Sequence, residues 1–169
     1  MKRKILRIIG IFMIICGVSV LSVFGYRKIS RELHLRQLLK ENVVLEIPAL
    51  HIKVPVLEGT DNEILSCAAG HFPNTGEVGH GNYCIAGHNS TIYAEIFNDL
   101  DKIQTGDTVY LTDTDQNRTQ YTYTVKEYHI VPPDATEVLK NTGDNRLTII
   151  SCTDDGKYRQ VVTAISSNS

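Results

Sequence analysis

The stretch Leu147–Val162, LTIISCTDDGKYRQVV, decides how the second half of the chain folds. Two runs rich in β-branched residues flank a short polar segment of turn residues, Thr153–Tyr158. This pattern predicts a β-hairpin. Directly opposite residues in such a hairpin have Cβ atoms about 4.5–5.5 Å apart. Cys152 and Arg159 are therefore predicted to face each other at the mouth of the hairpin.

A cysteine opposite an arginine has a use in catalysis. A nearby cation favours the thiolate form of a cysteine, and a guanidinium donates hydrogen bonds to an oxyanion that forms when sulfur attacks a carbonyl. The alternative is a buried structural cysteine beside a surface arginine, and composition alone does not separate the two. His88 is the candidate proton shuttle, because it ends a buried-type strand in NYCIAGHNS. The chain order His, Cys, Arg disfavours a papain-like enzyme, which runs Cys, His, Asn.

The rest of the chain from Val43 onward is predicted to be a small β-rich fold. Its short strand-like runs are separated by turn residues, and about eight strands are expected, which indicates a barrel or a sandwich. Helical turns are expected at residues 61–68, capped by Asp61, at residues 90–100, capped by Ser90, and at residues 134–140. The strand-like runs are VVLEIP, IKVPVLEG, NYCIAGH, DTVYLTD, TQYTYTVKEYHIV, RLTIIS and RQVVTAI.

The first 41 residues have a different character. Residues 8–26 form an uncharged run of 19 residues, preceded by four basic residues. About 20 apolar residues span a bilayer core, and this run is longer than the core of an ordinary signal peptide. We predict a cytoplasmic tail (1–7), a transmembrane signal-anchor (8–26), a helical stalk (27–41) and an extracellular domain (42–169). A buried core helix is the alternative for the apolar run.

Charge is unevenly divided between these parts. Nine of the 17 Lys and Arg residues precede residue 42, whereas 17 of the 19 Asp and Glu residues follow it. The predicted exported domain therefore carries a net charge near −9. Nucleic-acid binding needs a basic surface, so a nucleic-acid partner is not expected.

A second set of residues raises a metal hypothesis. Cys67, His71, His80 and Cys84 form a symmetric C-x3-H, H-x3-C pattern of zinc-compatible ligands. The spacing is not that of a common zinc finger. A disulfide between Cys67 and Cys84 is chemically allowed outside the cell, and two buried thiols are the third interpretation. The sequence leaves the three open.

Four segments resemble the sortases, membrane-anchored cysteine transpeptidases of Gram-positive surfaces. IPALHIKVPVLEGT is similar to the family's N-terminal strands, and GHGNYCIAGH to the segment that ends in its catalytic histidine. IFNDLDKIQTGDTVYL is similar to the helix and strand that follow, and VPPDATEVLKNTGDNRLTIISCT to the run into its catalytic cysteine. The resemblance covers residues 46–165 and maps the family's catalytic residues to His88, Cys152 and Arg159.

The resemblance implies a fold, a reaction and partners. The fold is the sortase-type closed barrel of about eight strands with short helices, behind a single transmembrane helix. The reaction cleaves a C-terminal sorting signal of the Leu-Pro-x-Thr-Gly type after Thr, through a thioester on Cys152, and transfers the surface protein to an amine of a cell wall precursor. Ser151 and Thr153 are candidate substrate-binding residues. No cofactor is required; Ca²⁺ activates some members, but no ligand pattern for it is readable here.

Two departures from the family pattern bear on its subclass. The usual Thr-Leu-x-Thr-Cys reads Thr148-Ile149-Ile150-Ser151-Cys152, and the loop from Cys152 to Arg159 holds only six residues. No Asp-Pro-aromatic lid segment and no long insertion before the final hairpin occur. A compact housekeeping-like or sporulation-associated type is favoured. The alternative function is a non-catalytic surface-binding module tethered to the membrane.

Overall fold

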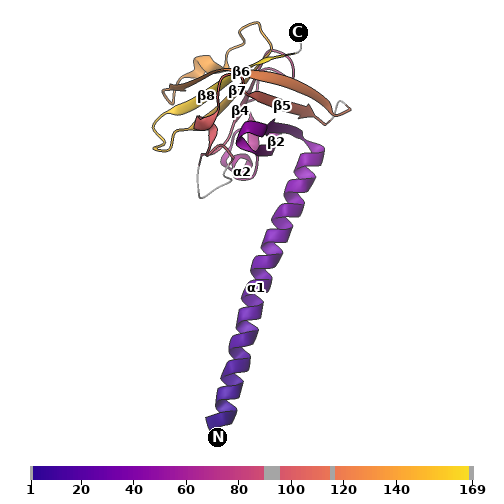
Figure 1. Ribbon diagram of the computed structural model, residues 1–169, viewed down its shortest axis with the longest axis vertical. Coiled ribbons are helices and arrows are strands. Elements are labelled where there is room, and N and C mark those ends of the chain that lie inside the picture. The colour runs from indigo at the N-terminus through magenta and orange to yellow at the C-terminus, as the bar shows by residue number, and fades with distance from the viewer. Residues whose placement is uncertain (1, 90–95, 115–116, 168–169) are drawn as a thin grey trace. The chain divides into compact units, whose positions relative to one another are not determined.

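The computed structural model describes residues 2–89, 96–114 and 117–167. The chain divides into two compact units, Met1–Gln37 and Leu38–Ser169. The first consists of most of one helix, and the second contains all the strands. Figure 1 traces the chain through both.

The helix α1 runs from Lys2 to Glu41 without a break. Its described side chains from Gly10 to Tyr26 are all exposed, including Phe12 (65 %) and Leu21 (72 %). From Gly10 onward it is the one described helix that is long and apolar enough to cross a membrane, by length and composition. The helix is apolar all round over this stretch, unlike the amphipathic helices that cover soluble cores.

Within the described residues, eight strands close into a barrel in the order β1-β2-β3-β4-β7-β8-β6-β5. The predicted barrel with short helices is confirmed. Closure leaves no sheet edge unpaired around the ring. The strands are β1 (Val43–Ile47), β2 (Ile52–Glu58), β3 (Ala69–His71), β4 (Asn82–Ala86), β5 (Thr108–Asp113), β6 (Thr119–Val131), β7 (Arg146–Cys152) and β8 (Arg159–Ser166).

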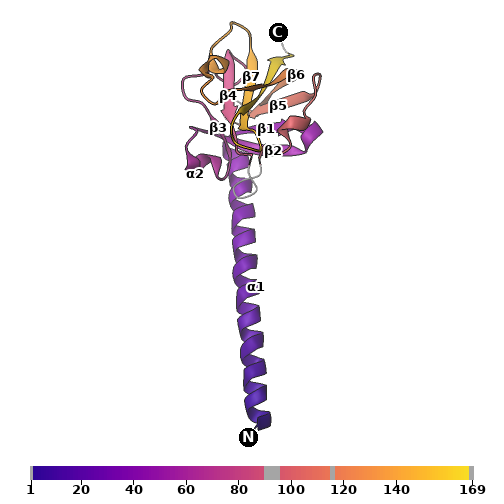
Figure 2. The same cartoon turned by 90° about the vertical axis from the view of Figure 1, so that its left-hand side faces the viewer.

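Two strand pairs are parallel, β2 with β3 and β4 with β7, and the others are antiparallel. Figure 2 shows β4 and β7 side by side. Parallel neighbours end at the same side of a sheet, whereas β7 and β8 form the predicted hairpin. One end of the barrel wall thus gathers the end of β4, the end of β7 and the start of β8.

The barrel interior is filled by one apolar cluster that draws on every strand. Leu45, Ile85, Leu111, Tyr123 and Ile149 are among its members and are fully buried. The hydroxyl of Tyr123 still finds a partner, because it accepts a hydrogen bond from the backbone N–H of Gly79 at 3.0 Å. A rigid, fully packed barrel holds the strand ends in fixed register.

The short helices follow the sequence expectations in part. The α-helical turn α2 (Asn62–Leu65) starts at Asp61, whose Oδ1 accepts from the N–H groups of Glu63 (3.0 Å) and Ile64 (3.1 Å), as predicted. The turn expected at residues 134–140 is a 3₁₀ helix, η3 (Thr136–Leu139). Of the helix expected at residues 90–100, residues 90–95 lie outside the described residues, and residues 96–99 form bends and turns before a 3₁₀ helix begins at Leu100. Two further 3₁₀ helices are η1 (Pro48–Leu50) and η2 (Leu100–Lys102).

Candidate active site

Strand register brings the three candidate catalytic residues together. Cys152 pairs with Arg159 across the β7–β8 hairpin, as predicted. Ala86 pairs with Ile150 in the parallel β4–β7 ladder, and the N–H of Gly87 continues this ladder to the carbonyl of Ile150 at 3.1 Å. Two residues further along both strands, His88 reaches the level of Cys152. Cys152 thus has Arg159 opposite it on β8, and His88 follows the end of β4 on its other side.

The side chains of Cys152 and Arg159 lie on the outer face of the barrel. Side chains alternate between the faces of a strand. Leu147 and Ile149 of β7 belong to the interior cluster, so Cys152 takes the opposite face with Ile150. Cys152 and Arg159 are both half-buried. The nucleophile candidate is therefore reachable from solvent while being partly shielded from it.

An apolar groove of about 160 Å³ lies on the same face and includes Arg159 in its lining. One wall comes from the strands and includes Ile150 and Val161. The other wall comes from the segment between β6 and β7, with Pro133, Val138 and Leu139 among its members. An extended peptide with apolar side chains fits a groove of this chemistry beside the cysteine.

A second hollow, of about 400 Å³, borders the loop between β7 and β8. The rings of Tyr128 and Tyr158 and the carboxylates of Asp101, Asp154 and Asp155 contribute to its lining. No Lys or Arg is among the described residues that line it. The negative electrostatic potential of these carboxylates favours a positively charged group next to the mouth of the β7–β8 hairpin.

The comparisons with known proteins decide the family. Residues 45–166 match the Sortase domain family. The chain belongs to the sortase family. Sortase A of Bacillus anthracis is 32% identical over 120 residues, 70% of this chain and 56% of that protein. Sortase A of Listeria monocytogenes is 32% identical over 108 residues, 64% of this chain and 47% of that protein. This sortase thus spans about half the length of the curated relatives it matches.

Solved structures show the same fold. A Sortase D5 transpeptidase of Clostridium perfringens superposes with a TM-score of 0.67 at 31% identity, over 80% of this chain and 88% of that one. Sortase A of Corynebacterium diphtheriae, as a lid mutant, gives a TM-score of 0.69 at 24% identity, over 76% of this chain and 71% of that one. The latter likeness concerns the fold alone.

Two side-chain amides that the sequence did not single out hold the peptide group of Cys152 in this sortase. The carbonyl oxygen of Cys152 accepts a hydrogen bond from Nδ2 of Asn89 at 3.1 Å and from Nε2 of Gln160 at 2.8 Å. Gln160 is buried (3 % exposed), and its Oε1 accepts from the hydroxyl of Tyr128 at 3.1 Å. The only sequence signal was position, since each amide directly follows a candidate catalytic residue.

Ser151 and Thr153, the candidate substrate-binding residues, are engaged within the protein. Ser151 is buried (3 % exposed), and its hydroxyl donates to the carbonyl of Gly87 at 2.9 Å. This hydrogen bond joins the residue before Cys152 to the residue before His88, so Ser151 helps to fix the relative positions of these two segments. The hydroxyl of Thr153 donates to Asp155 at 2.6 Å and accepts from the N–H of Tyr158 at 3.2 Å, which closes the loop.

The guanidinium of Arg159 is turned toward the loop. Its Nη1 donates to the carbonyls of Tyr158 at 3.1 Å and Gly156 at 3.4 Å. A guanidinium has five N–H donors in a planar fork, and within the described residues the hydrogen bonds of Arg159 use Nη1, so Nε and Nη2 can donate to an oxygen of a substrate. The loop carbonyls orient the fork while leaving part of it available.

The zinc and disulfide hypotheses for Cys67, His71, His80 and Cys84 are both wrong. Both cysteines are free thiols: Cys67 is exposed, whereas Cys84 is buried. Within the described parts of the chain, no group of three or more His, Cys, Asp or Glu residues is placed to hold a metal ion. The ring of His71 instead contacts Oε2 of Glu58 at 2.6 Å and stacks on Tyr83 with centroids 4.2 Å apart.

Proposed function

We propose that this sortase is a cysteine transpeptidase that cleaves a sorting signal of the Leu-Pro-x-Thr-Gly type after Thr and joins the released surface protein to an amine of a cell wall precursor. The observation that carries the proposal is the direct pairing of Cys152 with Arg159, a residue that also lines the apolar groove. The β4–β7 register supports a position for His88 on the other side of Cys152. Family membership supports the reaction class.

In the first half-reaction, the thiolate of Cys152 attacks the carbonyl carbon of the threonine. Negative charge develops on the carbonyl oxygen, and N–H donors of Arg159 stabilise it there. His88 as an imidazolium gives its proton to the glycyl nitrogen as the C–N bond breaks. The products are a thioester on Cys152, a neutral His88 and a free amine. Covalent catalysis thus divides one difficult displacement into two easier steps.

In the second half-reaction, an incoming amine attacks the thioester carbonyl. His88 takes the proton from the attacking nitrogen, and Cys152 leaves as a thiolate, so the starting protonation states return. The acidic hollow beside the loop supports an approach for a cationic amine from that side, because Asp154 and Asp155 attract it electrostatically. Water in place of the amine gives hydrolysis.

The acyl-enzyme is the decisive test. The full chain in detergent is incubated with a Leu-Pro-x-Thr-Gly peptide and no amine, and its intact mass is followed. We expect an adduct on Cys152 that hydroxylamine removes, and no adduct with Cys152→Ala. Adducts that persist in Cys152→Ala would refute the assignment. Peptide binding without any adduct on the wild-type chain, with its thiols titrated as free, would favour the alternative of a non-catalytic binding module.

We infer that α1 anchors the sortase in the cell membrane, with the N-terminus in the cytoplasm and the barrel outside. Support for the anchor comes from α1, the one helix among the described residues that is long and apolar enough to cross a membrane. Basic residues flank the apolar run at both ends, so the orientation is decided by the following experiment. On intact spheroplasts, added protease should remove a C-terminal epitope and spare an N-terminal one. The opposite pattern would reverse the orientation. A compact housekeeping-like or sporulation-associated type remains our proposal for the subclass, supported by the lack of an Asp-Pro-aromatic segment and of a long insertion before the final hairpin in the sequence.

A further inference from the structure

One wall of the apolar groove is formed by the chain segment that connects β6 to β7, and the backbone of this segment is mostly irregular. Residues 132–145 contain one short 3₁₀ helix, η3, and the backbone bonds of Ala135 and Lys140 are local turns to Pro132 and Glu137. Such a segment has no strand ladder to fix its distance from the barrel. Its position therefore depends on side chains that reach it from the barrel.

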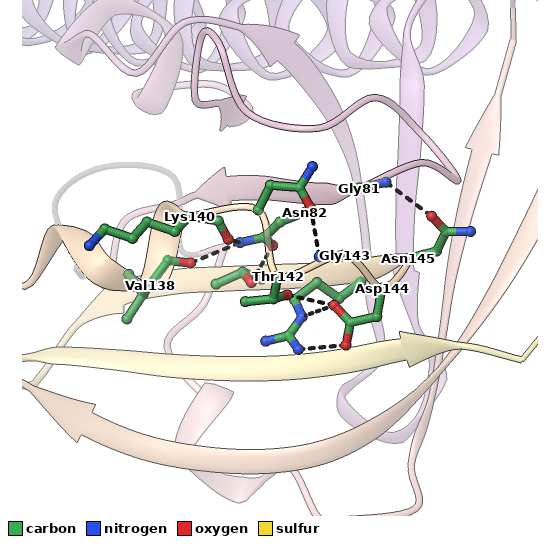
Figure 3. A network of polar contacts seen from close by, with 11 residues as sticks. Gly81, Asn82, Val138, Lys140, Thr142, Gly143, Asp144 and Asn145 are labelled. Carbon is green, nitrogen blue, oxygen red and sulfur yellow. Dashed lines mark hydrogen bonds and ion pairs between the residues drawn. The ribbon is translucent and has the colours of Figure 1, made fainter.

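Asn82 makes the principal connection of this kind (Figure 3). It is the first residue of β4 and is 1 % exposed. Its Nδ2 donates to the carbonyl of Val138 and to the carbonyl of Lys140, both at 2.9 Å. The same Val138 carbonyl lies 4.0 Å from the thiol of Cys84, a much weaker contact. Both N–H donors of the Asn82 amide thus form hydrogen bonds to backbone carbonyls of the groove wall.

Thr148 of β7 fixes which way this amide faces. Thr148 is 2 % exposed, and its hydroxyl donates to Oδ1 of Asn82 at 2.6 Å. A hydroxyl that donates to Oδ1 holds the amide oxygen toward β7 and thereby directs the NH₂ group toward the segment. Every polar atom of this buried amide has a partner, as burial requires.

The far end of the segment has separate attachments (Figure 3). Oδ1 of Asn145 accepts a hydrogen bond from the N–H of Gly81 at 3.0 Å. Oδ1 of Asp144 accepts one from Nε of Arg146 at 2.7 Å. Loss of the Asn82 amide would therefore release the middle of the wall, around Val138, while the end that enters β7 stays in place.

We propose that Asn82 is a positioning residue that, oriented by Thr148, sets the width of the groove that receives the apolar part of the sorting peptide. This rests on the proposed function of the groove. Asn82 begins β4, and His88 follows two residues after the end of this strand at Ala86. The position of β4 therefore bears on both the candidate proton shuttle and the groove wall.

The test is Asn82→Asp in the full chain, a change of nearly equal shape that removes both donors. We expect KM for the sorting peptide to rise at least tenfold, with kcat changed less than threefold. Reactivity of Cys152 toward iodoacetamide should stay within twofold of wild type. Amide hydrogen exchange of residues 135–140 should accelerate, a readout that needs no substrate. Thr148→Val should shift KM and exchange in the same direction, because the amide loses its orientation.

Two variants serve as matched controls. Asn145→Asp adds the same charge at a residue hydrogen-bonded to Gly81, the neighbour of Asn82, but keeps the oxygen that accepts from Gly81, and Thr148→Ser keeps the hydroxyl. Both should behave like wild type. If Asn82→Asp does not fold, Thr148→Val carries the test. The proposal would be overturned if Thr148→Val and Asn82→Asp both kept the KM and the amide hydrogen exchange of the wild type. A loss of kcat at constant KM would also overturn it. A wild-type chain that forms no acyl adduct would instead overturn the proposed function. The hydrogen-exchange rates of residues 135–140 would still test whether Asn82 and Thr148 hold the groove wall in place.

Discussion

At the scale of single residues, the carbonyl oxygen of Cys152 shows how the proposed nucleophile is kept in place. It accepts from Asn89 on one side and from Gln160 on the other. These two amides come from the chain segments that also carry His88 and Arg159. A shift of any one of the three strand ends is therefore resisted by a hydrogen bond to the cysteine's own peptide group.

Replacing Gln160 tests this arrangement. Gln160→Leu fills a similar volume but removes the donor to Cys152 and the acceptor for Tyr128. One buried hydrogen bond is worth about 0.5–1.5 kcal/mol, so we expect the acylation rate to fall about two- to tenfold. The rate is measured by quenched-flow mass spectrometry of the acyl-enzyme. Gln120→Leu, the same change at an exposed position of β6, is the control, and equal losses in both variants would contradict the prediction.

The meeting of Cys152 with Arg159 was predictable from the sequence because a hairpin's register follows from its alternating pattern and its short turn. His88 could be named because it ends an apolar run. Asn89 and Gln160 could not, since an amide's role depends on which carbonyl lies opposite it in space. The hydrogen bond from Ser151 to the carbonyl of Gly87 could not be predicted either, because it depends on the pairing of β7 with β4.

At the scale of elements, the position of a thiol along its strand sets its reactivity. Cys84 lies inside β4 and is fully buried. Burial raises the pKa of its thiol to about 11, and the hydrogen bonds of Thr148 and Thr75 and the charge of Arg146 only partly oppose this. Cys152 ends β7 and is half-exposed. The same residue type therefore has two environments on neighbouring strands.

We predict that iodoacetamide at pH 8 labels Cys152 at least a hundredfold faster than Cys84 in the folded full chain. Thiolate is the reactive form, and a thiol with a pKa near 11 is almost entirely protonated at that pH. Peptide mapping by mass spectrometry gives both rates. In denaturant the two rates should converge. Comparable labelling of both cysteines under native conditions would show that β4 opens more readily than its burial indicates.

Element prediction from the sequence succeeded where the strands are long and failed where they are short. β6 spans 13 residues with clear alternation and was expected. β3 has three residues, too few for any periodicity, and was not among the expected strands. Its pairing with both β2 and β4 is a tertiary feature, and without it the barrel would not close.

At the scale of the whole molecule, the junction into β7 links stability to pH. The guanidinium of Arg146 lowers the pKa of Asp144 to about 2, from an ordinary value of 3.8. A carboxylate with a lowered folded-state pKa stabilises the fold above its unfolded-state pKa. That stabilisation is lost as the pH falls from 3.8 to about 2.

Asp144→Asn should accordingly lower the unfolding temperature at pH 6 and have no effect near pH 2. The pair is partly exposed, with 25 % of the Arg146 side chain and 39 % of the Asp144 side chain accessible, so the effect should stay below about 1 kcal/mol. Thermal unfolding followed by near-ultraviolet circular dichroism measures it. Asp134→Asn, an exposed carboxylate of the same segment, is the control. A deficit that is the same at pH 6 and pH 2 would disprove the linkage.

The direct pairing of Cys152 with Arg159 has an evolutionary consequence. The hairpin ladder fixes the two residues opposite each other before the chain enters the loop from Thr153 to Tyr158. Insertions or deletions within that loop leave the ladder intact, whereas a single residue added to β7 or β8 would turn one of the pair to the other face. The loop borders the acidic hollow. Descendants of this chain can therefore vary the loop beside this hollow by changes in a few codons, without any intermediate in which Cys152 and Arg159 are no longer opposite each other.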